Sequence, residues 1–273
     1  MDMATKGKLF RDMHYGNDAF IIPNPYDAGT AKLLAACGFQ ALATTSAGYA
    51  FSAGVPDNNI SRDDMIRHSA TIVDATDLPV SADLENGFYD APEEVARTIA
   101  MAAEVGLVGG SIEDSVNKGH HSGQYDIGFA KERIAAAVEA ARALPYAFTL
   151  TARAENFLVG KPDIADVVAR LQAYEDAGAD VLYAPGLTRE ADVRTVVENV
   201  SKPVNVVMGL SGLQFSQQAL SAMGVKRIST GSSLSRVALG AFLRASEEMR
   251  DHGTFAYAED ALPFGRINAM FEA

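Results

Sequence analysis

Short apolar segments alternate with longer amphipathic segments along most of the chain. The short segments are rich in β-branched and small residues and end in turn residues or polar groups, as is typical of strands that are buried on both faces. Eight of them are predicted to be strands: residues 20–23, 41–45, 79–83, 108–112, 147–151, 180–183, 203–207 and 227–230.

The longer segments place apolar residues three and four positions apart, which predicts helices with one buried face. They cover residues 27–36, 62–75, 92–104, 129–143, 163–177, 189–199, 213–223 and 234–250. Gly38, Gly106, Gly178 and Gly224 each follow one of these helices and precede the next strand, where a left-handed helix cap is needed. The repeating unit of the chain is therefore helix, glycine, strand.

Eight such units in 273 residues amount to about 34 residues each, close to the size of a minimal βα repeat. Parallel strands joined by right-handed crossovers close into a (β/α)8 barrel of the TIM type, and a doubly wound open sheet is the alternative. Polar residues after most strands favour the barrel, because there they converge on one C-terminal mouth. They are Asn24, Asp27, Ser46, Gly48, Asp83, Glu85, Glu113, Asp114, Arg153, Glu155 and Asn205.

No linker, low-complexity tract or block of charge divides the chain, so residues 1–273 are predicted to form a single α/β barrel domain. The tail over residues 251–273 follows the last predicted barrel helix and contains four aromatic residues, Phe255, Tyr257, Phe264 and Phe271. Surplus apolar surface of this kind needs a partner. We therefore expect this extension to make contacts between the subunits of an oligomer.

The net charge of −12 and the pI of about 4.8 change the list of plausible partners. Nucleic acid and anionic membranes would be repelled at long range, which leaves a small molecule as the expected partner. The single cysteine excludes an internal disulfide and fits a reducing compartment. With no apolar segment typical of a signal peptide or a membrane span, we expect a cytoplasmic protein.

Acidic residues at the ends of separate strands predict a metal site. Asp83 and Glu85 are two positions apart and share a face of the chain. Together with Glu113 and Asp57 they are candidates to surround Mg²⁺, some directly and some through water, because Mg²⁺ keeps several of its waters. The alternative is structural: Glu85 caps the next helix, and Glu113 pairs with Arg153.

Arg153 follows an apolar strand and offers a bidentate fork to a carboxylate or a phosphonate. An ion pair with Glu155 or Glu113 is the structural alternative, and both roles are compatible. The turn Ser46-Ala47-Gly48 after the second strand has small residues whose backbone N–H groups are candidates to hold an anion.

The segment over residues 117–123 follows the fourth strand and combines glycines with the proton-transferring side chains Lys118, His120 and His121. These features fit a gating loop over an active site, and they fit a solvated loop equally well.

Taken together, these motifs resemble the isocitrate lyase and phosphoenolpyruvate mutase superfamily over residues 20–242. The motifs are Pro23-Asn24-Pro25-Tyr26-Asp27, Thr45-Ser46-Ala47-Gly48, Ser81-Ala82-Asp83-Leu84-Glu85-Asn86-Gly87, Ser111-Ile112-Glu113-Asp114, Thr151-Ala152-Arg153 and Asn205. The resemblance implies a (β/α)8 barrel, a homotetramer built as a dimer of dimers in which a C-terminal helix is exchanged between neighbours, and a 2-oxo acid bound to Mg²⁺, with Mn²⁺ as a possible substitute.

Carried over by position, the resemblance implies that Asp83 is the direct metal ligand and that Asp57, Glu85 and Glu113 hold its waters. Ser46, Ala47 and Gly48 would face the substrate carboxylate, and Arg153 would hold its other oxygens, with Asn205 as a further substrate contact. Mg²⁺ and Arg153 together would stabilise the enolate oxygen that forms when a bond next to a carbonyl carbon breaks.

Two departures narrow this expectation. The lyases carry a cysteine in a Lys-x-Cys-Gly-His loop, whereas the corresponding stretch here begins Lys118-Gly119-His120-His121. The phosphonate enzymes have a histidine after strand six, where this chain continues from Tyr183 into Ala184-Pro185-Gly186. The chain is therefore similar to the branch that lacks the lyase cysteine.

We therefore predict a Mg²⁺-dependent lyase or decarboxylase that cleaves a small, oxaloacetate-like 2-oxo carboxylate through an enolate. The candidate catalytic residues are Arg153, Lys118, His120, His121 and Tyr183. The alternatives are phosphonopyruvate hydrolysis, mutase-type C–P chemistry, or a barrel that binds a 2-oxo acid without turning it over. An aldolase with a Schiff-base lysine ranks last, because none of the predicted strands contains a lysine.

Overall fold

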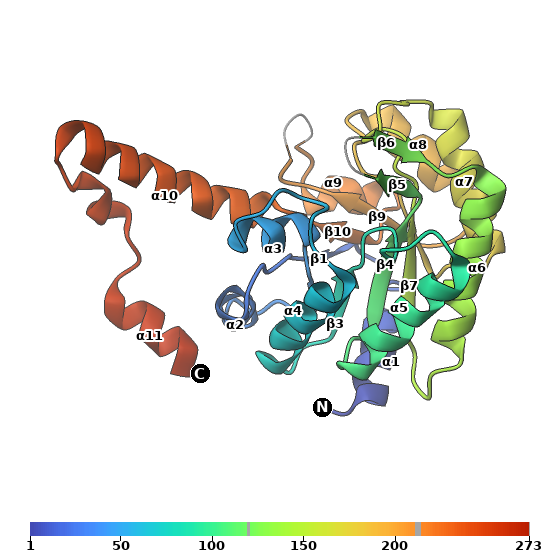
Figure 1. The fold of residues 1–273 in the computed structure, drawn as a ribbon, viewed down its shortest axis with the longest axis horizontal. Coiled ribbons are helices and arrows are strands. Elements are labelled where there is room, and N and C mark those ends of the chain that lie inside the picture. The colour runs from blue at the N-terminus through green and yellow to red at the C-terminus, as the bar shows by residue number, and fades with distance from the viewer. Residues whose placement is uncertain (119–120, 211–213, 273) are drawn as a thin grey trace.

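The computed structural model describes residues 1–118, 121–210 and 214–272 and confirms the predicted (β/α)8 barrel (Figure 1). Eight parallel strands follow the order β1-β10-β9-β8-β7-β4-β3-β2. Between the two ends of this order, the Ala43 N–H donates to the Pro23 carbonyl at 3.1 Å. The strands are β1 (Phe20–Ile22), β2 (Leu42–Ala43), β3 (Val80–Asp83), β4 (Gly109–Glu113), β7 (Thr149–Arg153), β8 (Val181–Tyr183), β9 (Val204–Val207) and β10 (Arg227–Ser229).

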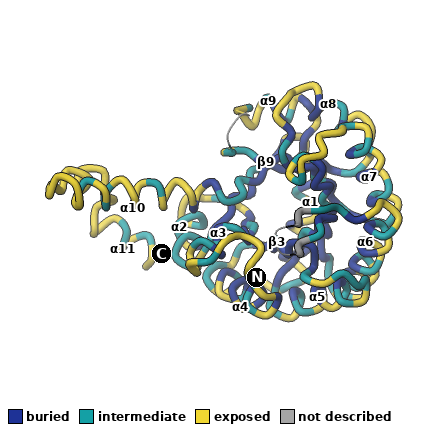
Figure 2. Tube along the Cα trace, turned by 45° about the horizontal axis from the view of Figure 1, so that its top comes forward, coloured by how far each residue is buried: buried dark blue, intermediate teal, exposed yellow. Residues whose placement is uncertain are grey.

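Helices surround the strands as an outer ring (Figure 2). Side-chain caps begin several of them where the sequence changes from strand to helix; Asp27, Ser61 and Asp163 each accept backbone N–H groups of the first turn. The ring comprises α2 (Ala28–Ala36), α3 (Ser46–Ser52), α4 (Arg62–Asp74), α5 (Pro92–Glu104), α6 (Ile127–Arg142), α7 (Ile164–Asp176), α8 (Glu190–Asn199), α9 (Gln217–Ala222) and the start of α10 (Ser233–His252).

The predicted glycine caps are present in the structure. Gly38, Gly106, Gly178 and Gly224 have φ values between 88° and 99°, a range that residues with a Cβ rarely adopt. The chain therefore reverses sharply after these helices and enters the next strand.

The floor of the barrel is closed by α1 (Met3–Met13). Phe10 on this helix is fully buried and forms a separate apolar cluster with Ile22, Ala41 and Val108. Gly109 at the start of β4 leaves room for this helix, because a Cβ there would lie 2.8 Å from the Phe10 ring and 2.9 Å from the Thr149 carbonyl oxygen. The main core lies between the strands and the outer helices.

Two segments differ in detail from the sequence prediction. Residues 46–48, which were predicted as a turn, form the first turn of the short helix α3. The segment over residues 117–123 was predicted as a loop, but β5 (Ser115–Lys118) and β6 (His121–Gln124) pair as an antiparallel hairpin. The sequence lacks the period-2 apolar pattern that identifies a buried strand, because this hairpin lies outside the barrel.

Beyond the barrel, α10, the 3₁₀ helix η1 (Ala256–Asp260) and α11 (Phe264–Glu272) form an arm that projects to one side (Figures 1 and 2). The far end of the arm returns toward α2, where Phe271 approaches Gly29. Within the described residues, none of the helices combines the length and the apolar character that a membrane crossing needs.

Candidate active site

Arg153 is the last residue of β7 and lies at the C-terminal mouth of the barrel. Its guanidinium contacts three carboxylates: Nη1 lies 2.8 Å from Asp83 Oδ1, Nη2 lies 3.0 Å from Glu113 Oε2, and Nε lies 2.9 Å from Glu155 Oε1. These acids come from the ends of β3 and β4 and from the loop after β7. The structure thus brings Asp83 and Glu113 together around one cation, and it also contains the Arg153 ion pairs that sequence reasoning set out as the structural alternative.

Asp83 is held from two sides. Its Oδ1 faces Arg153, and its Oδ2 accepts the Ser46 hydroxyl at 2.8 Å and the Ser46 N–H at 3.2 Å. The Gly48 N–H donates to the Thr45 hydroxyl, which caps α3. In this arrangement two of the amides in the segment 46–48 are engaged within the protein, so an incoming carboxylate would have to compete with Asp83 for Ser46.

Glu85 is buried in a strained backbone conformation at the mouth. Its φ of 49° lies in the left-handed region, which a residue with a Cβ adopts only at a cost. The residue is 5% exposed, and its Oε1 has no hydrogen-bond partner. Burial, reinforced by the charges of Asp83, Glu113 and Asp57, raises the pKa of Glu85 to about 9. The capping alternative for Glu85 is wrong, since α5 begins at Pro92 after the N-cap residue Ala91, and no side chain caps it.

Asp57 lies on the exposed rim of the mouth, in the connection between α3 and α4. Loss of hydration on its inner side, followed by the negative charges of Asp83 and Glu113, raises the pKa of its carboxyl. In the part of the chain that the structure describes, no three His, Cys, Asp or Glu side chains converge closely enough to bind a metal ion by themselves. A metal at this mouth would therefore need water among its ligands.

Glu155 and Asp114 are site residues to which sequence reasoning gave no chemical role. Glu155 is 3% exposed, and burial raises its pKa to about 8 while Arg153 opposes that shift. Asp114 accepts the Glu155 N–H at 2.9 Å and also binds Arg170 and Tyr174. Asp114 thereby fixes the end of β4 against α7 and the loop after β7. The sequence signal that could have identified Glu155 and Asp114 is that each of them follows a predicted strand.

Tyr183 is the last residue of β8, whereas Asn205 is the second residue of the neighbouring strand β9 and lies deeper in the barrel. The Arg153 guanidinium carbon lies 5.2 Å from the centre of the Tyr183 ring. Burial raises the pKa of the Tyr183 phenol, with a partial opposing effect of Arg153. Asn205 is 1% exposed and bonds to Ser229 and Arg227 inside the barrel, a position that suits support of the site better than direct contact with substrate.

Three predicted catalytic residues fall within the sequence segment 117–123. Lys118 and His121 pair across β5 and β6, and only their backbones are described. His120 lies outside the described residues. Their roles stay predictions.

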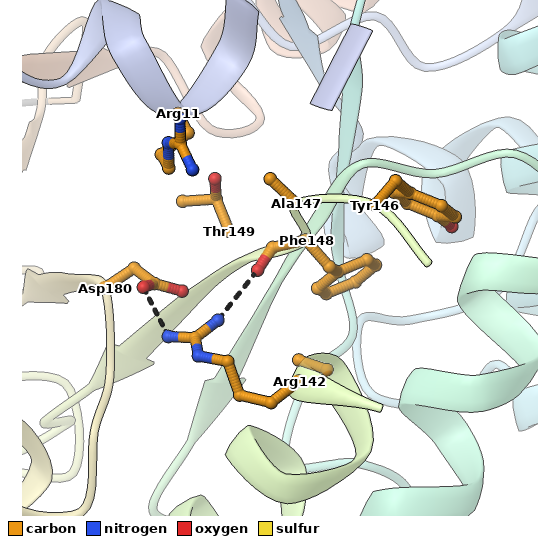
Figure 3. A pocket seen from close by; sticks show the side chains of 8 residues that line it. Arg11, Arg142, Tyr146, Ala147, Phe148, Thr149 and Asp180 are labelled. Atoms are coloured by element: carbon orange, nitrogen blue, oxygen red, sulfur yellow. Dashed lines mark hydrogen bonds and ion pairs between the residues drawn. The ribbon is translucent and has the colours of Figure 1, made fainter. Parts of the chain in front are cut away.

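A cavity of 340 Å³ lies at the opposite end of the barrel, where β7 and β8 begin. Figure 3 shows that Arg142 bridges its wall by bonding to the Asp180 carboxylate and to the Phe148 carbonyl. Asp180 in turn accepts the Leu150 N–H at 2.8 Å. These charged groups satisfy one another and join α6 to two strands, so we assign the cavity wall a structural role.

The charge balance distinguishes the mouth. Among the described side chains there, three carboxyl groups (Asp83, Glu113 and Glu155) contact the Arg153 guanidinium, and two more (Asp57 and Glu85) lie close enough for the charges of Asp83 and Glu113 to raise their pKa values. Buried carboxylates in this excess stay ionised only if further positive charge is bound, and otherwise they take up protons. The site can therefore hold a divalent cation, and Arg153 offers N–H donors to an oxyanion.

The chain is similar to known proteins in both sequence and structure. The profile of the phosphoenolpyruvate phosphomutase family matches residues 10–250. The 2-methylisocitrate lyase of Escherichia coli K12 is 32% identical over 211 residues, which cover 75% of this chain and 70% of the relative.

Two solved structures superpose over nearly the whole chain. One, a "putative lyase/mutase" from Burkholderia cenocepacia J2315, is 59% identical with a TM-score of 0.96 and covers 99% of this chain and 97% of its own. The other, oxaloacetate acetylhydrolase in complex with the product oxalate, is 25% identical with a TM-score of 0.88 and covers 99% and 95% of the two chains. The chain therefore belongs to the phosphoenolpyruvate phosphomutase family and is a lyase-class enzyme of the isocitrate lyase/PEP mutase superfamily.

Proposed function

We propose that the protein is a Mg²⁺-dependent carbon–carbon lyase that cleaves a small, oxaloacetate-like 2-oxo carboxylate through an enolate. One observation carries this proposal: Arg153 is fixed at the barrel mouth within a set of carboxyl groups whose charge exceeds its own. Such a site offers an oxyanion both a guanidinium fork and the charge of a bound cation. Relatives named for the cleavage of 2-methylisocitrate and of oxaloacetate support the same class of substrate.

The donor set at the mouth fits a hard divalent cation. All of the donors are carboxyl oxygens, and Glu85 Oε1 is buried with no partner. Mg²⁺ prefers oxygen ligands and retains water, which agrees with the absence of three converging protein ligands in the described chain. In this proposal Asp83 binds the ion directly, and Asp57, Glu85 and Glu113 bind its waters, with Mn²⁺ as a substitute. When bound, the ion supplies positive charge that polarises the 2-oxo group.

The residues of the chain bind the substrate and direct its cleavage. Arg153 donates to the substrate oxygens and stabilises the enolate oxygen as negative charge develops on it. In oxaloacetate the C3–C4 bond breaks, its electron pair stays on the three-carbon enolate, and CO₂ leaves. A proton must then return to C3 to give pyruvate. Tyr183 lies against Arg153 and keeps its proton at neutral pH because burial raises its pKa, so we assign it as the proton donor.

Turnover assays with purified full-length protein test this proposal. We expect oxaloacetate to lose CO₂ in a reaction that requires Mg²⁺, and we expect Asp83→Ala to lower kcat/KM at least about 100-fold. Asp77→Ala is the matched control, because the Asp77 side chain is 93% exposed at the far end of the barrel. Release of phosphate from phosphonopyruvate in place of oxaloacetate cleavage would contradict the proposal in favour of C–P chemistry. Tight binding of both acids without turnover would contradict it in favour of a non-catalytic binder.

We also propose that the projecting arm packs against a second copy of the chain. It exposes large apolar side chains, including Val237 and Phe242 at 68% and Phe264 at 82%, and exposed apolar patches of this kind mark interaction surfaces. The arm leaves the barrel beside the site, because Ser235 lies next to Gly48 of α3. Light scattering after size exclusion should show an oligomer that dissociates in Phe242→Asp but not in Leu158→Asp, a control at an exposed leucine outside the arm. A wild-type monomer would contradict this proposal.

A further inference from the structure

The three carboxylates around Arg153 bind different nitrogens of its guanidinium. Nη1 and Nη2, here called the Nη fork, lie 2.8 Å from Asp83 Oδ1 and 3.0 Å from Glu113 Oε2. Nε donates instead to Glu155 Oε1, at 2.9 Å. Two parallel N–H donors of a guanidinium bind an oxyanion in a bidentate manner. The bond to Glu155 uses neither donor of the Nη fork, whereas Asp83 and Glu113 are the acids that the proposed function assigns to the cation and its waters.

Charge balance does not explain why Glu155 is present. The two carboxylates of Asp83 and Glu113 already exceed the single positive charge of Arg153. Glu155 is 3% exposed, so a third carboxylate adds a cost of desolvation and repulsion from the acids beside it. The turn after β7 does not need this side chain either, because the Leu158 N–H donates to the backbone carbonyl of Glu155 at 2.9 Å. The explanation must lie in what the side chain does to Arg153.

Hydrogen-bond geometry gives that explanation. An arginine side chain has several rotatable bonds and loses much rotamer freedom when it is ordered. Its guanidinium, however, is planar and rigid, so an acceptor that fixes the direction of Nε–H also fixes the directions of both Nη groups. The Tyr183 ring supports the same group from one side, since its centre lies 5.2 Å from the guanidinium carbon. Glu155 therefore sets the direction of the Nη fork of Arg153.

Asp114 fixes the backbone that carries both Arg153 and Glu155. Its N–H donates to the Arg153 carbonyl at 3.2 Å, and its Oδ1 accepts the Glu155 N–H at 2.9 Å. Its Oδ2 accepts from Arg170 Nη1 at 3.1 Å, and the residue is 2% exposed. The backbone on both sides of residue 154 is thus bonded to the end of β4. Arg153 and Glu155 cannot move relative to that strand without breaking these bonds.

We infer that Glu155, fixed by Asp114, is a positioning residue that holds the Nη fork of Arg153 toward Asp83 and Glu113. This inference rests on the proposed function for its catalytic meaning, because there Arg153 donates to the substrate oxygens. Glu155 bonds to Nε and not to the fork. It therefore acts on the reaction through Arg153 and not through a contact of its own with the substrate.

Two substitutions of Glu155 separate position from charge. Glu155→Gln keeps the length of the side chain and an oxygen acceptor for Nε but removes the charge, whereas Glu155→Asp keeps the charge and withdraws it by one methylene group. With oxaloacetate and Mg²⁺ we expect Glu155→Asp to lower kcat/KM about 100-fold and Glu155→Gln to lower it less than about tenfold. A loss in Glu155→Gln of 100-fold, or one as large as in Glu155→Asp, would overturn the inference, because charge would then decide activity.

An exposed pair with the same geometry provides the matched control. Arg194 Nε donates to Glu190 Oε1 at 2.8 Å on the surface of α8, where both side chains are nearly half exposed. Glu190→Asp makes the same chemical change outside the set of residues that contact Arg153. It should therefore keep the wild-type kcat/KM. The unfolding midpoint of each variant shows that it is folded, and the result for the isosteric Glu155→Gln decides the test even if Glu155→Asp does not fold.

A readout without turnover keeps this test distinct from that of the proposed function. With arginine labelled by ¹⁵N at Nε, the signal absent in Arg153→Lys identifies Arg153. We expect its Nε–H to exchange with solvent at least about tenfold faster in Glu155→Asp, and to stay protected in Glu155→Gln and Glu190→Asp. Equal protection in Glu155→Asp and wild type, or its loss in a folded Glu155→Gln, overturns the inference. Failure of the wild-type protein to turn over any 2-oxo acid refutes the proposed function instead.

Discussion

Preferential protonation of His14 in the unfolded chain should lower the stability of the fold below neutral pH. The imidazole is 1% exposed, and it lies between the Phe10 carbonyl and the Arg227 guanidinium. Burial, together with the charge of Arg227, lowers its pKa to about 3, whereas an unperturbed histidine titrates near 6.5. Because the folded state binds this proton less readily than the unfolded chain, the stability from neutral His14 is complete above the unfolded value and is lost as the pH falls toward the folded one.

The size of the effect follows from linkage. Between pH 7.5 and pH 5.0 an unfolded-state histidine of pKa 6.5 takes up most of one proton while buried His14 takes up almost none. Stability then falls by about 2 kcal/mol from this residue alone. The value depends little on the folded pKa, provided that it lies well below 5.

Urea unfolding followed by circular dichroism, at one protein concentration and constant ionic strength, measures this loss. His14→Gln keeps an acceptor for Arg227 but does not titrate, so its unfolding free energy should fall about 2 kcal/mol less than that of the wild type over this pH range. His252→Gln, at an exposed histidine of α10, should retain the wild-type dependence. Parallel curves for the wild type and His14→Gln would refute the reasoning.

Three further changes probe the site and its support. The raised pKa of Glu85, about 9, means that the stability of the fold is lost as the pH rises above the unfolded value of 4.5. Thermal unfolding in EDTA at pH 8 should therefore show Glu85→Gln about 1–3 kcal/mol more stable than wild type. Added Mg²⁺ should stabilise this variant less than it stabilises the wild type. Arg133 is 1% exposed and donates to the backbone carbonyls of Asn86 and Glu113 behind the site. Arg133→Met should lower the free energy of unfolding in urea by about 3 kcal/mol and should also lower kcat. Full activity of this variant would contradict a role of Arg133 in supporting the site. Gly109→Ala places a methyl group 2.8 Å from the Phe10 ring and should lower the unfolding free energy by about 1–3 kcal/mol, which a stability equal to wild type would contradict.

Much of the fold could be predicted from local patterns. Apolar runs that end in acids, amphipathic stretches of three-residue and four-residue spacing and a glycine before each of several strands are properties of neighbouring residues, so the eight βα units and their order are readable without the fold. The residues at the mouth of the barrel could also be predicted. A residue at the C-terminal end of a barrel strand, such as Asp83, must lie at the mouth once the strands are parallel.

Other parts of the site required the structure. The hairpin of β5 and β6 forms a two-stranded sheet separate from the barrel, and its sequence carries no apolar period that distinguishes it from a loop. His14 carries no local signal either, because its burial depends on α1 closing the floor against strands distant in sequence. Arg227 reads as a polar residue in a short strand, and only the closed barrel shows that it has no carboxylate partner in the described chain.

The sequence by itself therefore determined the architecture and the end of the barrel at which Asp83, Glu113 and Arg153 lie. These follow from periodicity and strand ends, which are local. Only the tertiary structure decided which groups pair, which carboxyls are left in excess and in which direction the hydrogen bonds around Asn205 run. Those properties depend on distances and burial between segments as many as 213 residues apart, and electrostatic and hydrogen-bond energies are set by these quantities rather than by neighbours in sequence.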